Sequence, residues 1–225
     1  MLDHLPASIR AFAVTQRGHG DASRPEAGYR PEDFASDLEA FMEALHLEAA
    51  VLVGHSSSCF TARRFAIDRP DRTLGLVFIG SPVAMRGNPA VQELWDSTMS
   101  KLTDPIDPAF VRGFAGSTLA RHVPEAFFET VVQESLKVPA RVFKEVLRAL
   151  LEDGSAAELD AIEAPTLLLW GERDAISTRS DQEELAASIA GSRLMVYAGA
   201  GHSPHWEEPA RFASDVAAFI EGLGR

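Results

Sequence analysis

Apolar residues along this chain gather in five short runs, each bounded by polar residues, glycine or proline. Short runs of this kind, rich in valine, isoleucine and leucine, are typical of buried β-strands. We therefore predict strands at residues 9–15, 51–53, 73–80, 165–170 and 193–197.

Between these runs the apolar positions recur with a helical period. We predict an amphipathic helix over residues 31–46 and further helices over 57–68 and 209–223. Strands that alternate with helices indicate βαβ units and a parallel sheet. The predicted fold class is therefore α/β, with a mostly parallel sheet of about five strands flanked by helices.

From residue 84 to residue 158 the pattern is helical only. Pro108, Pro124 and Pro139 each open an amphipathic segment, which is typical of proline in the first turn of a helix. We predict a helical insertion over residues 84–158. It divides the α/β core into a first part, residues 1–83, and a second part, residues 159–225.

Residues 50–59 read Ala-Val-Leu-Val-Gly-His-Ser-Ser-Ser-Cys, so an apolar run meets Gly54 and Ser56, and a helical pattern begins at once. This strand–turn–helix order is typical of a nucleophile elbow, which exposes a serine hydroxyl at the top of a sheet. Ser58 stands where the Gly-x-Ser-x-Gly motif has its second glycine. A plainer interpretation is that Gly54 ends a strand and residues 56–58 cap a helix.

A reactive serine needs a base, and the base needs a carboxylate that fixes its tautomer. Asp174 lies on the loop after the strand predicted at 165–170, and His202 follows the strand predicted at 193–197. The candidate catalytic residues are therefore Ser56 as nucleophile, Asp174 as acid and His202 as base.

Four groups of residues resemble the α/β-hydrolase superfamily, in particular its capped esterase and epoxide-hydrolase-like branch. They are residues 16–21 with 23–25, residues 54–56, residues 171–174 and residues 201–209. In that superfamily serine, acid and histidine follow strands in this chain order. The resemblance implies the same three catalytic residues and a cap formed by the helical insertion. Epoxide hydrolases and haloalkane dehalogenases use an aspartate nucleophile, so Ser56 argues against both chemistries.

Members of that superfamily carry roughly forty residues before the position of Met1, including a parallel strand that ends in a His-Gly motif. The loop after that strand supplies one N–H of the oxyanion hole, and the residue after the nucleophile, here Ser57, supplies the other. We therefore expect a hydrolase fold that lacks its first strands. The missing strand would lie between residues 9–15 and the strand at 51–53. One alternative is a monomer in which these two strands pair directly and residues 1–7 cover the gap. The other is a homo-oligomer, most simply a dimer, with residues 1–20 near the contact.

Composition and charge indicate which classes of binding partner and which compartment suit this chain. The net charge of −12 disfavours nucleic acid and anionic membranes, and no apolar run is long enough to span a bilayer. The chain begins without the basic and apolar segments of a signal peptide, and its single cysteine, Cys59, fits a reducing compartment. We predict a cytoplasmic enzyme that acts on a small molecule without a cofactor or metal, because the triad supplies nucleophile and base itself.

The leading functional hypothesis is a serine hydrolase that cleaves carboxylic esters or lactones of neutral, fairly apolar substrates through an acyl-enzyme on Ser56. His55, Trp95 and Met99 are candidate substrate-binding residues, although Trp95 and Met99 would equally fill the interior of the cap. Amide and carbon–carbon bond hydrolysis use the same triad and stay open. A hypothesis of another class is a catalytically poor binding or scaffold protein with an incomplete oxyanion hole.

Overall fold

The computed structural model describes residues 2–224 of the 225-residue chain. Its centre is a parallel sheet of four strands in the order β1 (Ala50–His55), β2 (Thr73–Ile79), β3 (Thr166–Gly171) and β4 (Arg193–Tyr197). β3 is buried along its whole length, which explains its continuous apolar sequence, because a strand inside a parallel sheet is covered on both faces. The predicted α/β class is confirmed.

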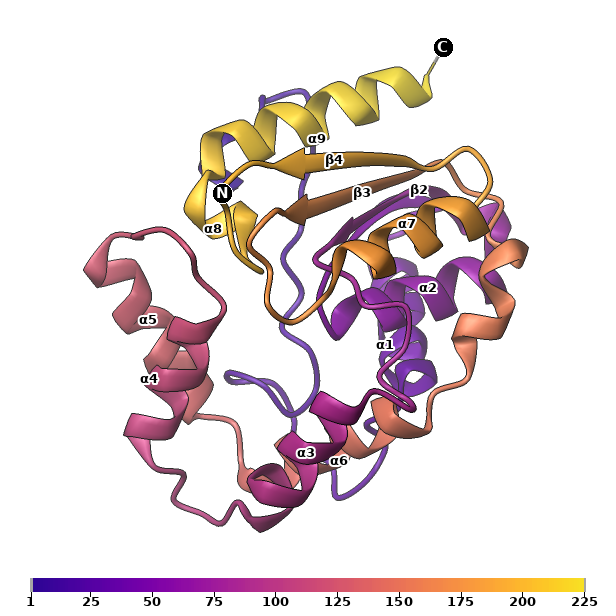
Figure 1. Cartoon of the computed structure of the whole chain (residues 1–225). Helices are drawn as coiled ribbons and strands as arrows, with labels where there is room; N and C mark the ends of the chain where they lie inside the picture. Colours follow the sequence, from indigo (N-terminus) through magenta and orange to yellow (C-terminus); the bar gives the residue numbers. More distant parts are fainter. Residues whose placement is uncertain (1, 225) are drawn as a thin grey trace.

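Two layers of helices cover the sheet (Figure 1). On one face α1 (Pro31–Ala44), α2 (Ser58–Asp68) and α7 (Arg179–Ser188) pack against Leu52, Phe78 and Leu168. On the other face α9 (Pro209–Leu223) packs Phe212 and Val216 against Val77 and Leu169. The alternation of side chains along each strand therefore splits the core into two apolar layers.

The chain between β2 and β3 is helical, as predicted. It contains α3 (Pro89–Ser97), η3 (Met99–Lys101), α4 (Pro108–Ser117), α5 (Glu125–Leu136), α6 (Ala140–Glu152) and η4 (Ser155–Ala161). Pro108 opens α4, while Pro124 and Pro139 directly precede α5 and α6. Figure 1 shows α4 and α5 beyond the arrowheads of β3 and β4, so part of the insertion faces the carboxyl edge of the sheet.

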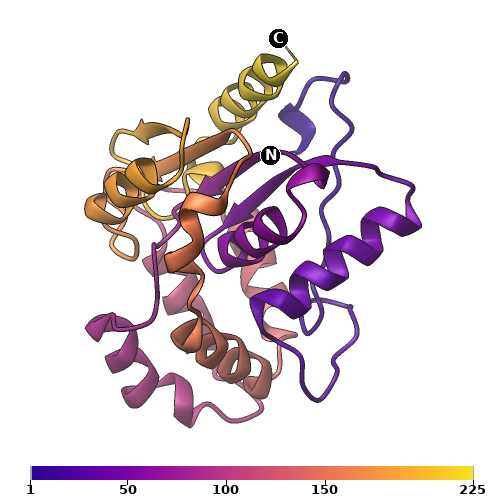
Figure 2. The ribbon, with the colours of Figure 1, turned by 90° about the vertical axis from the view of Figure 1, so that its right-hand side faces the viewer.

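The strand predicted at residues 9–15 is wrong. Residues 10–15 have no regular secondary structure and are exposed, with Phe12 at 41% and Val14 at 42%. Figure 2 shows this indigo segment descending from η1 (Leu2–His4) toward α1, and the Phe12 ring meets Phe41 of α1 at 5.7 Å between centroids. The apolar run had the composition of a strand, but a strand also needs a neighbouring strand to pair with. The sheet accordingly has four strands instead of about five.

Strand β1 is therefore an edge of the sheet, and its Val53 is 48% exposed. Direct pairing between residues 9–15 and β1 does not occur in the described part of the chain. Residues 2–4 contact α9, and Met1 lies outside the described residues. Association with a second copy stays a prediction.

Helix α2 is buried on most of its surface. Cys59 is fully buried with its Sγ 3.8 Å from the carbonyl oxygen of Ile79, and burial raises the pKa of this thiol to about 11. The Arg63 guanidinium is also fully buried and donates to the carbonyl oxygens of Pro82 and Val83.

Over residues 2–224, the structure contains no helix with the length and apolarity needed to cross a membrane.

Candidate active site

The turn between β1 and α2 holds Ser56 in a left-handed backbone conformation, with φ of +53°. Residues other than glycine seldom adopt this region, and the strain persists only where the surroundings fix it. Here the Ser56 N–H donates to the carbonyl oxygen of Ile79 at 2.9 Å, and the Cys59 N–H donates to the carbonyl oxygen of Ser56 at 3.0 Å. The backbone thus has the shape expected of a nucleophile elbow.

Two small residues beside Ser56 make the turn possible. A Cβ at Gly54 would lie 2.8 Å from the carbonyl oxygen of Ser58 and from the Cα of Cys59, so strand and helix leave room for glycine only. Ser58, where the motif has glycine, uses its hydroxyl to accept from the His55 N–H at 2.8 Å and to donate to the His55 carbonyl oxygen at 2.9 Å. The serine in place of the motif's glycine therefore adds two hydrogen bonds across the elbow.

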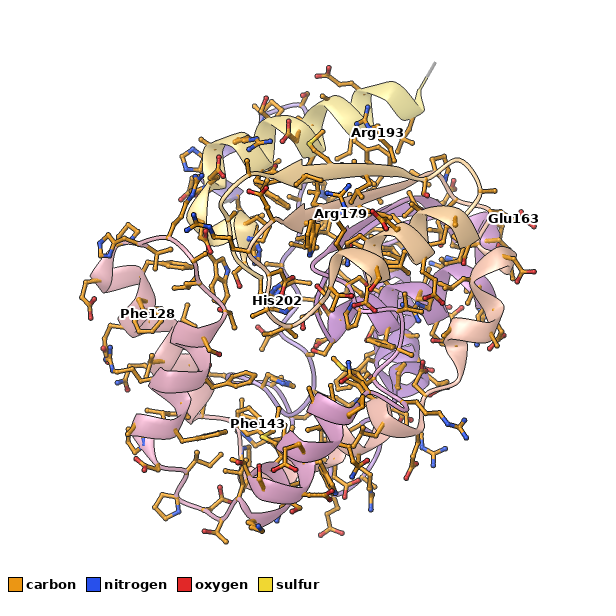
Figure 3. All side chains as sticks on the ribbon, viewed as in Figure 1. Phe128, Phe143, Glu163, Arg179, Arg193 and His202 are labelled. Atoms are coloured by element: carbon orange, nitrogen blue, oxygen red, sulfur yellow. The ribbon has the colours of Figure 1, made fainter. Side chains whose placement is uncertain are left out.

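Asp174 and His202 meet at the carboxyl edge of the sheet, on the loops after β3 and β4. His202 Nδ1 lies 2.8 Å from Asp174 Oδ2, and both side chains are almost fully buried. A carboxylate only accepts, so Nδ1 carries the proton of this bond and Nε2 keeps its lone pair in the neutral ring. Figure 3 shows His202 between the sheet and the insertion that carries Phe128 and Phe143.

The loop after β3 holds the Asp174 carboxylate on several sides. The Ser177 hydroxyl donates to Oδ2 at 2.6 Å, and the N–H groups of Ile176 and Ser177 donate to Oδ1 at 2.8 and 3.0 Å. Burial alone would raise the pKa of Asp174, but the bonds from His202, Ser177 and Ile176 outweigh it and lower that pKa. Asp174 is therefore an anion that can stabilise a positive charge on His202.

Two glycines at strand ends let these loops approach. A Cβ at Gly80, which has φ of +52°, would lie 2.8 Å from His202 Nδ1 and 3.1 Å from Asp174 Oδ2. A Cβ at Gly171 would lie 2.5 Å from the carbonyl oxygen of Ala200 and would overlap that of Gly201. Backbone at the ends of β2 and β3 thus forms the wall against which the acid–base pair rests.

The family model described as alpha/beta hydrolase fold matches residues 1–209. The chain belongs to this family. The resemblance found in the sequence motifs is thereby confirmed, and the sheet of parallel strands with its elbow at the end of β1 is the expected framework.

Several members of the hydrolase family are similar over nearly the whole chain. The AB hydrolase superfamily protein YisY from Bacillus subtilis is 27% identical over 97% of this chain and 84% of its own length. The 2-hydroxymuconate semialdehyde hydrolase of a Pseudomonas species is 29% identical over 98% of this chain and 79% of its own. Among solved structures, a thermophilic esterase from Thermogutta terrifontis has a TM-score of 0.79 and 25% identity, covering 92% of this chain and 78% of the esterase.

Two further histidine rings lie beside His202, the candidate base. The His55 ring lies 4.8 Å from that of His202 and 4.5 Å from that of His205, measured between centroids. His55 Nε2–H donates to the backbone carbonyl oxygen of His202 at 3.0 Å. Burial lowers the pKa of His55 to about 3 and lowers the pKa of His205 as well, so both rings are neutral near pH 7.

The remaining predicted site residues lie in different surroundings. Ser57, the candidate oxyanion donor, immediately precedes α2, and its N–H has no hydrogen-bond acceptor among residues 2–224. Trp95 is half-buried on α3 and Met99 is buried in η3. Neither lines the small cavity next to Ser57, so their role in substrate binding stays a prediction. No hydrogen bond joins Ser56 to His202 in the described chain.

Two residues that hold the site together, Ser177 and Glu207, were not predicted from the sequence. Ser177 was detectable, because an aspartate followed three residues later by serine is a common local hydrogen-bonded turn. Glu207 carried no local signal. Its carboxylate accepts from the N–H of Gly201 at 3.0 Å and from that of Ala120 at 2.9 Å, and so ties the insertion to the His202 loop.

Proposed function

We propose that this α/β-hydrolase is a serine hydrolase that cleaves carboxylic esters or lactones. One observation carries the proposal: Ser56 occupies a strained turn at the end of β1, and the buried Asp174–His202 pair lies at the same edge of the same sheet. The similarity to an esterase of the same fold supports ester hydrolysis as the reaction.

In the proposed reaction the Ser56 hydroxyl attacks the carbonyl carbon, and His202 Nε2 takes its proton. The negative oxygen of the tetrahedral intermediate accepts from the Ser57 N–H at the N-terminus of α2. When the intermediate collapses, His202 returns the proton to the departing alkoxide, and an acyl group stays on Ser56. Water then attacks the acyl-enzyme with His202 again as base, which releases the acid and restores Ser56.

The electrostatics of the site suit this cycle. Asp174 stays ionised because His202, Ser177 and backbone N–H groups stabilise its charge. It can therefore support the imidazolium that forms on His202 in each half-reaction. The neighbouring rings of His55 and His205 are neutral, so they place no positive charge beside that imidazolium.

The helical insertion, residues 84–158, is proposed to act as a cap over Ser56. Apolar side chains of α6, Val146 and Leu150, share the cavity beside Ser57 with residues of the core. An acyl group of a neutral, fairly apolar substrate would meet this lining. His55, Trp95 and Met99 are proposed to contact the substrate when it is bound.

Labelling with a fluorophosphonate tests the proposal, because the reagent modifies serines that a base activates. The wild type should be labelled at Ser56 and should hydrolyse short p-nitrophenyl esters. Ser56→Ala should lose both properties and keep its fold. Ser36→Ala, at an exposed serine of α1, is the matched control and should behave as the wild type. Activity retained in Ser56→Ala would overturn the assignment.

A second candidate function is a binding or scaffold protein with little catalysis. It is favoured by the oxyanion site, where the described chain offers one backbone donor beside Ser56, and by the missing hydrogen bond between Ser56 and His202. Carbon–carbon bond cleavage is a further alternative, since a relative at 29% identity is a 2-hydroxymuconate semialdehyde hydrolase. An unlabelled wild type would favour the binding or scaffold protein, and turnover of 2-hydroxymuconate semialdehyde without turnover of esters would favour carbon–carbon bond cleavage.

A further inference from the structure

Within residues 2–224 the proposed oxyanion site has one backbone donor, the N–H of Ser57, where acyl-transfer enzymes of this fold use two. The second donor normally comes from a loop after an early strand. Within residues 2–224 no strand precedes β1, so no such loop exists there. The space beside Ser57 is instead a cavity of about 30 Å³, room for roughly two water molecules.

The loop after residue 15 forms one wall of this cavity through Gln16 and His19. Ser57, Ser58 and Thr61, at the start of α2, also line this cavity. Because Gln16 and Ser57 line the same cavity, a ligand atom held at Ser57 lies in a space that the Gln16 side chain borders.

The polar groups around the cavity differ in whether they can donate. The Tyr29 hydroxyl already donates to Pro25, and the Ser58 hydroxyl already donates to His55. His19 Nδ1 lies 3.0 Å from the carbonyl oxygen of Arg17 and must be the protonated nitrogen, so Nε2 of the neutral ring accepts only. Thr61 sits one turn, about 6 Å, further along α2 than Ser57. The side-chain amide of Gln16 has no hydrogen-bond partner among the described residues, so its N–H groups are free to donate.

The loop that carries Gln16 is held in place on its C-terminal side. The Arg17 guanidinium donates to both carboxylate oxygens of Asp37, at 2.5 and 2.6 Å, and to the carbonyl oxygen of Gly28 at 3.0 Å. Gly18, with φ of +83°, lies against Tyr29 and Val142 so closely that a Cβ would be 2.7 Å from each. The backbone that carries Gln16 is therefore fixed before a developing charge forms at Ser57.

We propose that the Gln16 side-chain amide is the second hydrogen-bond donor to the oxyanion, beside the N–H of Ser57. This inference rests on the proposed serine-hydrolase function. Gln16 Nε2–H donates to the negative oxygen of the tetrahedral intermediate and makes a weaker bond to the ground-state carbonyl. It therefore acts on kcat more than on KM.

The test compares Gln16→Met, which keeps the length of the side chain and removes the donor, with Gln16→Glu, which also adds negative charge. Each should lower kcat for a p-nitrophenyl ester by about 10²- to 10³-fold with little change in KM. Affinity for a trifluoromethyl ketone, which forms a tetrahedral oxyanion on the serine, should fall by a similar factor. Gln133→Met, at an exposed glutamine of α5, is the control and should retain wild-type values.

Three results would overturn the inference. If the wild type neither labels with a fluorophosphonate nor hydrolyses esters, the proposed function itself fails, and this inference fails with it. If the wild type is active and Gln16→Met keeps kcat within about threefold, only the role of Gln16 is wrong. If kcat falls but affinity for the trifluoromethyl ketone does not, Gln16 supports the loop and does not touch the oxyanion.

Discussion

The Ser58 hydroxyl forms hydrogen bonds with both the N–H and the carbonyl oxygen of His55, the residue that precedes the candidate nucleophile. Ser58→Ala would leave the His55 N–H without its acceptor, because no strand within residues 2–224 lies on that side of β1. We expect a loss of about 1–3 kcal/mol in the free energy of unfolding and a lower kcat, since the elbow relaxes. Urea denaturation measures the first. Ser36→Ala removes a hydroxyl bonded on an exposed helix face and should change stability by less than about 0.5 kcal/mol. Equal effects of the two substitutions would mean that the hydrogen bonds of Ser58 with His55 do not stabilise the elbow.

His55 predicts how stability depends on pH. Its pKa falls from the ordinary 6.5 to about 3 on folding, mainly because burial disfavours the charged ring. Between pH 6.5 and about pH 3 the unfolded chain therefore binds up to one more proton at His55 than the native chain. The free energy of unfolding accordingly decreases as pH falls below 6.5. His205 and Asp174, whose pKa values are also lowered, act in the same direction.

His55→Phe keeps the ring and removes the proton site. Its free energy of unfolding should therefore fall less steeply with acid, by up to about 1.4 kcal/mol per pH unit below pH 6.5. Urea denaturation between pH 4.5 and 7.5 gives the two slopes. Identical slopes in wild type and variant would mean that His55 titrates normally in the native protein.

Among the elements, the end of β3 is where an added Cβ would meet its neighbours most closely. Gly171→Ala would drive a methyl group into the backbone of Ala200 and Gly201, so we expect a loss of about 3 kcal/mol or more in stability. Gly113→Ala is the matched control, because nothing lies within 4 Å of the new Cβ on α4. It should be stabilising by up to about 1 kcal/mol, since alanine favours a helix over glycine. Thermal or urea unfolding of both variants checks the contrast.

The elements also differ in how closely their sequences predict them. Strands β2, β3 and β4 and helix α9 were predicted within a residue or so, because the strands form short apolar runs and α9 has apolar residues at a helical period. The run at 9–15 has a similar composition yet forms no strand, since pairing depends on a neighbour that no local pattern contains. Helix α7 was not predicted, and with only Gln182 and Leu185 buried it carries a weak pattern.

The same distinction applies within the candidate site. Ser56, Asp174 and His202 could be assigned because each follows a strand, and the ends of parallel strands share an edge. The bond from His55 to the His202 carbonyl joins residues 147 apart in the chain, so only the fold reveals it. For Trp95 and Met99 the residue type carries no information on position in the fold, and neither residue lines the cavity beside Ser57.

At the scale of the whole molecule, the helical insertion fastens both loops that flank the candidate site. Glu207 and Arg121 link it to the loop of His202, through the Ala120 N–H and the carbonyl oxygen of Ala198. Arg141 of α6 donates to the carbonyl oxygens of Arg24 and Pro25, at 2.6 Å each, on the other side. The insertion therefore positions these loops relative to each other in addition to covering them.

The outer edge of β1 carries the last prediction. Since the Ser56 N–H points to β2, and alternate residues of a strand point opposite ways, the N–H and carbonyl groups of Val53 face away from the sheet. The exposed side chains of Val53, Phe12 and Val14 are apolar. An unpaired edge with such side chains favours association with another chain. We predict a homo-oligomer, most simply a two-fold dimer in which residues 1–20 and β1 lie at the contact.

Sedimentation velocity at micromolar concentration tests this arrangement. Val53→Lys should shift the wild-type dimer to monomer, because a charge at the edge opposes strand pairing. Phe114→Lys changes a comparably exposed apolar residue on α4, far from β1 in sequence, and should leave the dimer intact. Hydrogen exchange adds a second measure, since amides of β1 should be protected in the dimer and exchange quickly in Val53→Lys. A wild type that sediments as a monomer with protected β1 amides would show that the chain closes its own edge, and the oligomer would then be wrong.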